Sequence, residues 1–260
     1  MRELRKCLAT GFAHIYVFVI KHKVLSWTIF AVLVMFCVLM AARSATVETW
    51  TIHEVETQDM LPMSIINDDR IRSLSKHIYV MIDAGHGGKD PGALYNDIYE
   101  KDITLAVAKK VRSILEQKGI DVIMTREDDT FVDKYDRAHL ANDQKVDLFL
   151  SIHVNDLKQK QYSGIETYCG WLKLAGKQFA EYVHNSTVTA SNAKDLGVAC
   201  SNYVVVKYTR MPGALIEIGY MSNDKERKKM TSQAYQQTLA QGIADGVINY
   251  AKDNLGYTQP

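Results

Sequence analysis

The stretch IYVMIDAGHGG, residues 78–88, joins an apolar run to a glycine-rich turn that carries His86. The run is short and rich in apolar and β-forming residues, which predicts a buried strand over 78–83. The glycines around the histidine allow the backbone to turn sharply. Such a turn could be a phosphate-binding loop, a tight structural turn or the first ligand of a metal site.

The rest of the body predicts an α/β fold. Strands that alternate with helices are typical of a single domain in which helices flank a mostly parallel, twisted sheet. No internal repeat or low-complexity tract interrupts the pattern, so we expect one domain over 77–255. The expected strands are 78–83, 120–126, 147–154, 164–170, 202–207 and 213–219, and the expected helices are 102–119, 132–144, 173–190 and 232–252.

The N-terminal part differs from this body. Residues 24–42, VLSWTIFAVLVMFCVLMAA, carry no charge in 19 positions, which is long enough for a transmembrane helix. The basic residues in 1–23 predict that this segment is cytoplasmic and that the body lies outside the membrane. Residues 43–76 lack periodicity and are expected to form a juxtamembrane stalk. The alternative is a signal peptide cleaved near ARS, residues 42–44, which would release a secreted protein.

Charge and cysteine content exclude some classes of protein. Six of the 31 basic residues and one of the 30 acidic residues lie at positions 1–43, so the remainder carries a net charge of −4. A mildly acidic body argues against nucleic acid as a partner, because nucleic-acid binding needs a basic face. Cys169 and Cys200 are too few for a disulfide framework, and we expect them to be buried free thiols.

Four titratable side chains are expected to meet at one edge of the sheet. Ligands bind at the carboxyl ends of parallel strands. Two imidazoles and a carboxylate are a common ligand set of catalytic zinc sites, and a further carboxylate can act as a general base. The four are His86 after the first strand, His153 at the end of the third, Glu217 at the end of a late strand and Glu100 on the loop before the first helix.

The glycine-rich turn does not fit either of two nucleotide-binding loops, whereas a structural role for the single residues stays possible. A phosphate loop needs a Ser or Thr after its lysine, but Lys89 is followed by Asp90 and Pro91. A dinucleotide-binding fingerprint would need a glycine at position 90. A lone histidine is more often structural than a ligand, and Glu100 alone could be a solvated acid at a helix start. Glu217 is harder to explain, because a buried carboxylate is costly unless it is paired or bound to a metal. The residues alone therefore leave both a metal site and a structural role open.

Six short motifs occur in order along the chain: DAGHGG (83–88), EKD (100–102), TR (125–126), Arg137 with Ala141–Asn142, SIHVN (151–155) and EIGYMSN (217–223). Together they resemble the zinc-dependent N-acetylmuramoyl-L-alanine amidases with a type-3 catalytic domain, which cut bacterial peptidoglycan. The resemblance covers about residues 78–252. It implies zinc on His86, Glu100 and His153, with Glu217 as the catalytic acid/base.

The resemblance also implies a substrate. This would be the amide that joins N-acetylmuramic acid to L-alanine of the stem peptide, and Asn155 and Arg137 are expected to bind it or to brace the ligand loops. Ala84 replaces a proline that is frequent in the family's first motif. Only residues 154–163 separate His153 from the next strand, so the long helix that blocks the site in division-type relatives is not expected.

Several alternatives stay open at this point. The layout with an N-terminal anchor resembles small membrane-anchored amidases of spore-forming bacteria, which would indicate a role in sporulation. The domain could instead be a non-catalytic peptidoglycan-binding module, or a zinc peptidase that cuts within the stem peptide. The sequence does not identify an activating protein partner.

Overall fold

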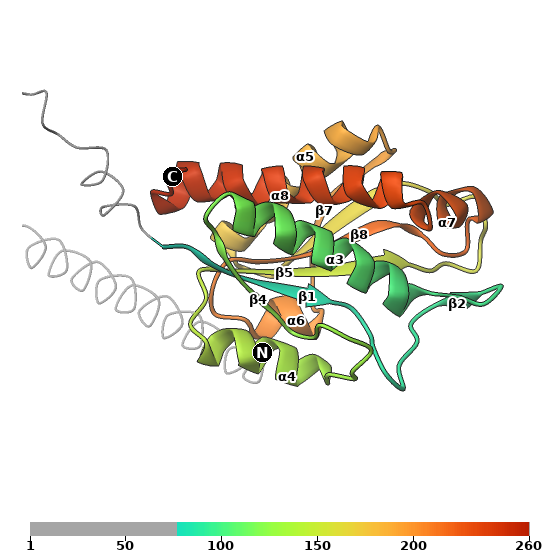
Figure 1. Cartoon of the computed structure of the whole chain (residues 1–260), viewed down its shortest axis with the longest axis horizontal. Helices are drawn as coiled ribbons and strands as arrows, with labels where there is room; N and C mark the ends of the chain where they lie inside the picture. The colour runs from blue at the N-terminus through green and yellow to red at the C-terminus, as the bar shows by residue number, and fades with distance from the viewer. Residues whose placement is uncertain (1–76, 260) are drawn as a thin grey trace, which may run out of the picture. The chain divides into compact units, whose positions relative to one another are not determined.

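A six-stranded sheet runs through the computed structural model, which describes residues 77–259 (Figure 1). Its strand order is β4-β1-β5-β8-β6-β7. The first four strands in this order are parallel, β6 is antiparallel to β8, and β7 is parallel to β6. The predicted α/β fold with a mostly parallel sheet is therefore confirmed. The strands are β1 (Tyr79–Ala84), β4 (Asp121–Met124), β5 (Leu148–Asn155), β6 (Ile165–Gly170), β7 (Asp195–Ser201) and β8 (Gly213–Tyr220).

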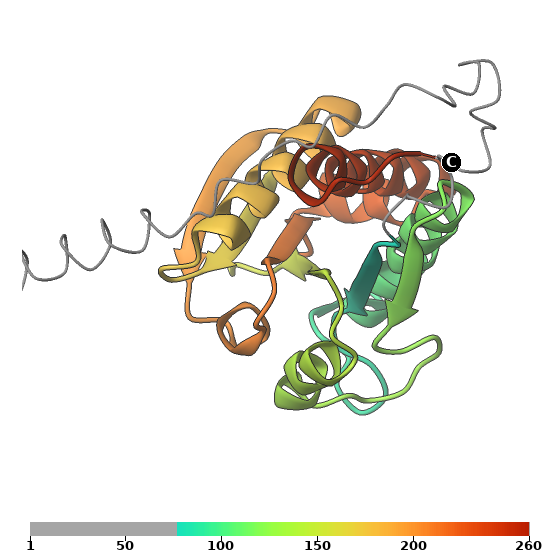
Figure 2. The ribbon, with the colours of Figure 1, turned by 90° about the vertical axis from the view of Figure 1, so that its left-hand side faces the viewer.

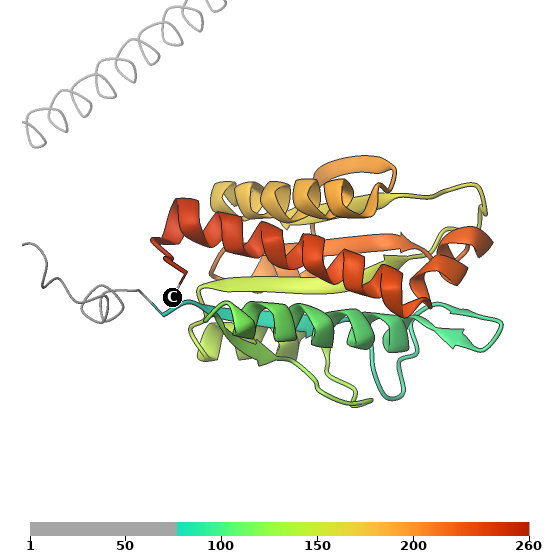
Figure 3. The same cartoon turned by 45° about the horizontal axis from the view of Figure 1, so that its top comes forward.

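Helices cover both faces of this sheet. On one face lie α3 (Glu100–Gln117), α5 (Leu174–Ser191) and α8 (Gln233–Leu255), and on the other lie α4 (Lys134–Asp143) and α6 (Val204–Tyr208) (Figure 2). Figure 3 shows α8 between α5 and α3. A short helix, α7 (Asp224–Met230), precedes α8, and a small hairpin of β2 (Leu94–Tyr95) and β3 (Ile98–Tyr99) precedes α3.

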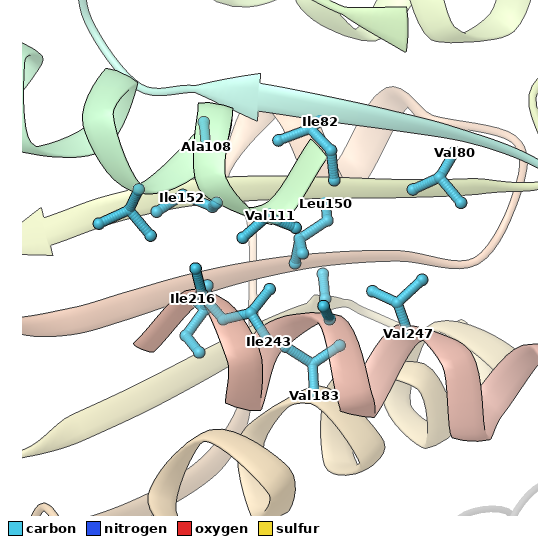
Figure 4. Close-up of a cluster of buried hydrophobic side chains, with 14 of the residues drawn as sticks. Val80, Ile82, Ala108, Val111, Leu150, Ile152, Val183, Ile216, Ile243 and Val247 are labelled. Carbon is cyan, nitrogen blue, oxygen red and sulfur yellow. The ribbon is translucent and has the colours of Figure 1, made fainter. Parts of the chain in front are cut away.

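The main core lies between the sheet and the three-helix layer (Figure 4). Alternate residues of the central strands face the opposite side, where Met81, Phe149 and Leu215 form a smaller cluster with Val205 and Val206 of α6. Because both faces are covered, the central strands are continuous apolar runs. Buried side chains of the main core include Val80, Ile82, Leu150, Ile152 and Ile216 from strands and Ala108, Val111, Val183, Ile243 and Val247 from helices.

The prediction of a strand over 202–207 is wrong. The three consecutive valines of this segment favour a strand by propensity, but Val204–Tyr208 forms the short helix α6. Val205 and Val206 are buried in the smaller cluster, and this tertiary packing outweighs a propensity difference of about 1 kcal/mol or less. Within the six-stranded sheet, the strand that the sequence does not predict is β7, whose sequence DLGVACS contains residues that are depleted in strands.

The predicted N-terminal segments 1–23, 24–42 and 43–76 lie outside the described residues. Within 77–259, no helix combines the length and the apolar character that crossing a bilayer requires.

Two glycines let α8 approach α5 closely. A Cβ atom added to Gly242 would lie 2.7 Å from the Cα of Thr187, and one added to Gly246 would lie 2.5 Å from the Cα of Val183. The atoms in the way belong to the backbone of α5, so rotation of a side chain cannot relieve the clash. The two helices are therefore in contact along a seam that has room only for glycine.

Gly246→Ala should destabilise the domain. Overpacking costs about 1–3 kcal/mol, and alanine recovers roughly 1 kcal/mol of helix propensity. Because the clash is with backbone, the upper end of the overpacking cost applies, and we expect a net loss of about 2 kcal/mol in the free energy of unfolding, measured by urea denaturation. Asn249→Ala, at an exposed position of the same helix, is the control and should change stability by less than about 0.5 kcal/mol. Equal stability of the two variants would contradict the close packing.

Candidate metal centre and active site

His86, Glu100 and His153 form a compact cluster at the carboxyl ends of β1 and β5. Their ligand atoms all lie within 4.8 Å of one another. The Oε1 atom of Glu100 lies 3.0 Å from Nε2 of His86 and 3.2 Å from Nδ1 of His153. The structure thus brings together three of the four residues that the sequence placed at this edge, with one carboxylate oxygen between two imidazole nitrogens.

Three elements position these side chains. His86 follows β1 by two residues, His153 belongs to β5, and Glu100 is the first residue of α3 rather than part of the preceding loop. Backbone amides fix the Glu100 carboxylate: Ala93 donates to Oε2 and Val154 donates to Oε1, each at 2.9 Å. These bonds hold the carboxylate in place before any metal binds.

The donor set fits zinc. Catalytic zinc sites commonly use three protein ligands from histidine and carboxylate and keep a fourth position for water. Nδ1 of His86 lies 2.8 Å from Oδ2 of Asp90, which leaves Nε2 directed at the cluster. A carboxylate behind a ligand histidine is the usual outer support of a zinc site.

Glu217, the fourth predicted residue, lies beside this cluster. It is the register partner of His153 on β8, and side chains of directly paired residues lie on the same face of a sheet. Glu217 is 7% exposed, and its Oε2 atom has no hydrogen-bond partner within the described part of the chain. An unsatisfied buried carboxylate oxygen is costly, which suits a group that exchanges protons with a substrate.

A cleft of about 480 Å³ gives access to these residues. One wall is the loop Phe131–Lys134 and another is the segment Tyr203–Val205. The side chains of His86 and His153 are 23% and 20% exposed, so solvent reaches the cluster. Within residues 77–259, no helix lies between β5 and β6. The cleft is lined by His86, Asp90, Phe131, Val132, Asp133, Lys134, Arg137, His153, Tyr203, Val204, Val205, Leu215 and Glu217.

Two buried arginines hold the turn that presents His86. His86 has φ 61°, a left-handed conformation that costs a non-glycine residue roughly 1–2 kcal/mol. Arg137 donates to the carbonyls of Ala84 and His86, each at 2.7 Å. Arg126 donates to the carbonyls of Ala84 at 3.0 Å and Gly85 at 2.9 Å. These bonds stabilise the strained turn.

Gly85 is required for a different reason. A Cβ atom at this position would lie 2.5 Å from Cε1 of His153. The turn therefore passes directly against the second imidazole, and only glycine allows this approach.

Asn155 and Arg137, expected to bind substrate or to brace the ligand loops, differ in their surroundings. Arg137 is 4% exposed, and its guanidinium also donates to Asp83 and to the carbonyl of Val132. These contacts support the bracing role. Asn155 ends β5, and its carbonyl accepts from the amide of Met221. A substrate-binding role for either residue stays a prediction.

The two carboxylates of the site have opposite pKa shifts. For Glu100, burial opposes ionisation, but hydrogen bonds from His153 and His86 hold its pKa well below the usual range. For Glu217, burial dominates and raises the pKa to about 7. Glu100 is thus suited to be a permanently charged ligand, and Glu217 can take up and release a proton near neutral pH.

Sequence reasoning missed two features of this site. The first is Asp90, which supports His86; the sequence motifs use this residue only to exclude a phosphate loop and a dinucleotide-binding fingerprint. The position of Asp90, four residues after His86 in the same turn, is the feature of the sequence that could have indicated this contact. The second is the Tyr203–Val205 wall of the cleft, because the sequence predicts a strand over residues 202–207 and no local pattern indicates the helix α6.

Comparisons with known proteins agree on one family. Residues 80–249 match the Amidase_3 family model, described as N-acetylmuramoyl-L-alanine amidase. A sporulation-specific N-acetylmuramoyl-L-alanine amidase of Bacillus subtilis is 34% identical over 175 residues, which are 65% of this chain and 67% of that protein. The crystal structure of an N-acetylmuramoyl-L-alanine amidase of Clostridium difficile matches with a TM-score of 0.67 and 37% identity, covering 69% of this chain and 100% of that one. The CwlD amidase of Clostridioides difficile, solved in complex with the GerS lipoprotein, matches with a TM-score of 0.65 and 30% identity over 68% of this chain and 100% of that one.

Zinc binding to the metal-free protein should release a proton. Burial lowers the pKa of His86, but the carboxylates of Glu100 and Asp90 outweigh this and raise it to about 8. Zinc needs the neutral imidazole, so affinity should fall as the pH drops below about 8, by up to about tenfold per pH unit for one linked proton. Isothermal titration at pH 7 in two buffers with different ionisation enthalpies measures the released proton. Identical heats in the two buffers would contradict this linkage.

Proposed function

This chain belongs to the family of N-acetylmuramoyl-L-alanine amidases, and we propose that His86, Glu100 and His153 hold a catalytic zinc ion in its cleft with Glu217 as general acid/base. The enzyme is a peptidoglycan hydrolase that cleaves the amide bond between N-acetylmuramic acid and L-alanine of the stem peptide. The observation that carries the zinc mechanism is the three-ligand cluster with Glu217 in direct register beside His153.

Zinc, when bound, supplies Lewis acidity that acidifies water and polarises the substrate carbonyl. The chain's own residues supply the proton transfers. Glu217 accepts the proton of the water that attacks the carbonyl carbon, and it then delivers a proton to the nitrogen of the departing L-alanine. Its pKa of about 7, raised by burial, suits a group that must do both in one cycle.

Other residues hold this arrangement in place. Asp90 orients the imidazole of His86 through Nδ1, and Arg137 fixes the turn through the carbonyl of His86. Asn155 follows His153 at the end of β5 by two residues, and we assign it to the orientation of the substrate. The walls at Phe131–Lys134 and Tyr203–Val205 bound the space in which the glycan and the stem peptide lie.

We assign the catalytic domain, 77–255, to the extracytoplasmic side, where peptidoglycan lies. The uncharged run at 24–42 would anchor the chain in the membrane, with 1–23 in the cytoplasm and 43–76 as a stalk. Cleavage of a signal near residues 42–44 is the alternative and would release a secreted enzyme. The sporulation-specific relative supports a role in sporulation. The CwlD amidase was solved in complex with the GerS lipoprotein, which supports the proposal that this chain also binds a protein partner, one that activates it.

Product analysis tests the reaction. Protein from residue 44 onward is incubated with purified peptidoglycan, and the products are identified by mass spectrometry. Free stem peptides that begin with L-alanine should appear, disappear on chelation and return when zinc is added. Cuts within the stem peptide would identify a peptidase instead. A protein that binds one zinc ion and releases no product, even with added cell extract, would favour a non-catalytic binding module.

Glu217→Gln tests the proton-transfer role. The amide keeps the size of the side chain but cannot accept the proton, so the rate should fall roughly 10²- to 10⁴-fold. Zinc content, measured by elemental analysis, should stay at the wild-type value, whereas His153→Ala should lose both zinc and activity. Glu181→Gln, on the exposed surface of α5, is the matched control and should keep full activity. Near-normal turnover of Glu217→Gln would refute the assignment.

A further inference from the structure

Two cysteine thiols face each other on neighbouring strands outside the metal centre. Cys169 of β6 is the register partner of Cys200 of β7, and their sulfur atoms lie 3.5 Å apart. Cys169 is buried and Cys200 is exposed, so the expectation of two buried thiols is wrong for Cys200. In the amino-acid sequence the two residues are 31 positions apart, and only the pairing of β6 with β7 brings them together.

The geometry suits a disulfide bond. Disulfides join residues whose Cα atoms are about 4.4–6.8 Å apart, and neighbouring strands lie about 4.7–4.9 Å apart. The sulfur atoms must approach by roughly 1.5 Å to reach the bonded distance of about 2.05 Å. Rotation of the two side chains about their Cα–Cβ bonds changes this distance, because both sulfur atoms belong to register partners on neighbouring strands.

The position of the pair connects it to the cleft. β7 is an edge strand whose ladder partner within the described sheet is β6. Cys200 precedes Tyr203, the first residue of one cleft wall, by three positions. Tyr168, next to Cys169, packs edge-to-face on Tyr203 with ring centroids 5.1 Å apart. A covalent link between residues 169 and 200 would hold the base of this wall against the body of the sheet.

We propose that Cys169 and Cys200 form a reversible disulfide that ties β7 to β6 and braces the Tyr203 wall of the cleft. The oxidant is an external disulfide, either a small molecule or a protein. The exposed Cys200 thiolate attacks one sulfur of that disulfide and releases one external thiol. Cys169 then attacks the sulfur of Cys200 and releases the second external thiol. Two protein thiols are oxidised, and one external disulfide is reduced to two thiols.

The difference between the two thiols sets the order of these steps. Burial, together with the hydrogen bond between the sulfurs, raises the pKa of Cys169 to about 11. The thiolate is the nucleophile, so Cys169 is the slower one and is also shielded from an external disulfide. Disulfides persist outside the cytosol, where reducing systems are absent, which is the side on which peptidoglycan lies.

Peptide mapping tests the link directly. The full chain is incubated with oxidised glutathione, remaining thiols are alkylated, and the protein is digested with trypsin without reduction. The expected product joins peptides 161–173 and 195–207, with a mass lower by two hydrogen atoms than the sum of the free peptides. Finding both cysteines alkylated, or Cys200 carrying only glutathione, would overturn the proposal.

Two variants separate the steps. Cys169→Ser should trap glutathione on Cys200, because the resolving thiol is missing. Cys200→Ser, at an exposed position that should not disturb folding, should leave Cys169 unmodified. Glutathione on Cys169 in the second variant would contradict the assigned order of attack.

The bracing effect has its own measurement. The thermal midpoint of the oxidised chain should lie several degrees above that of the reduced chain, and Cys200→Ser should show no difference between the two conditions. Equal midpoints for oxidised and reduced wild type, with the cross-linked peptide present, would overturn the bracing role.

Discussion

The buried ion pair between Asp83 and Arg137 fixes the geometry on which the site depends. Nη1 of Arg137 lies 2.6 Å from Oδ1 of Asp83, which has no solvent exposure. Burial opposes the charge on Asp83, but Arg137 and the hydroxyls of Ser151 and Thr125 hold its pKa below the usual range. The carboxylate of Asp83, on β1, thereby contacts Ser151 of β5, Thr125 directly after β4 and Arg137 of α4. Through Arg137 the same network reaches the carbonyl of His86, so the turn that carries the first proposed metal ligand is held by the interior of the fold.

Glu100 and Glu217 have identical side chains, and their different surroundings suit them to different proposed roles. Glu100 accepts two backbone hydrogen bonds and lies between two imidazoles, which keep it ionised. Glu217 lies on β8, the strand that pairs with β5, and there burial favours the neutral form of its carboxyl group. The roles proposed for the two carboxylates, metal ligand for Glu100 and general acid/base for Glu217, therefore follow from what each of them contacts.

The amino-acid sequence predicts two features of this molecule: the buried strands, and the meeting of their carboxyl ends at one edge of the sheet. The apolar runs that precede His86, His153 and Glu217 identify buried strands, and the rule for parallel sheets brings their ends together. The antiparallel pairing of β6 with β8 is not encoded in such a pattern. The residue pattern of a strand is the same whether it pairs in parallel or antiparallel. Residues 202–207 show the same limit: their valines fit a strand, and the contact with the opposite face of the sheet makes them a helix. The strained turn at His86 depends on arginines far away in the chain, so its φ angle could not be derived from the turn itself.

The direct connection from β5 to β6 has a consequence for how the enzyme meets its substrate. Peptidoglycan is a meshwork, and few of its strands offer a free end. A glycan could enter an enclosed active site only by its free end. A cleft that no helix between β5 and β6 covers can instead bind a glycan from the side, at any point along its length. Within residues 77–259 no helix or strand between β5 and β6 has to move before a glycan can reach the cleft.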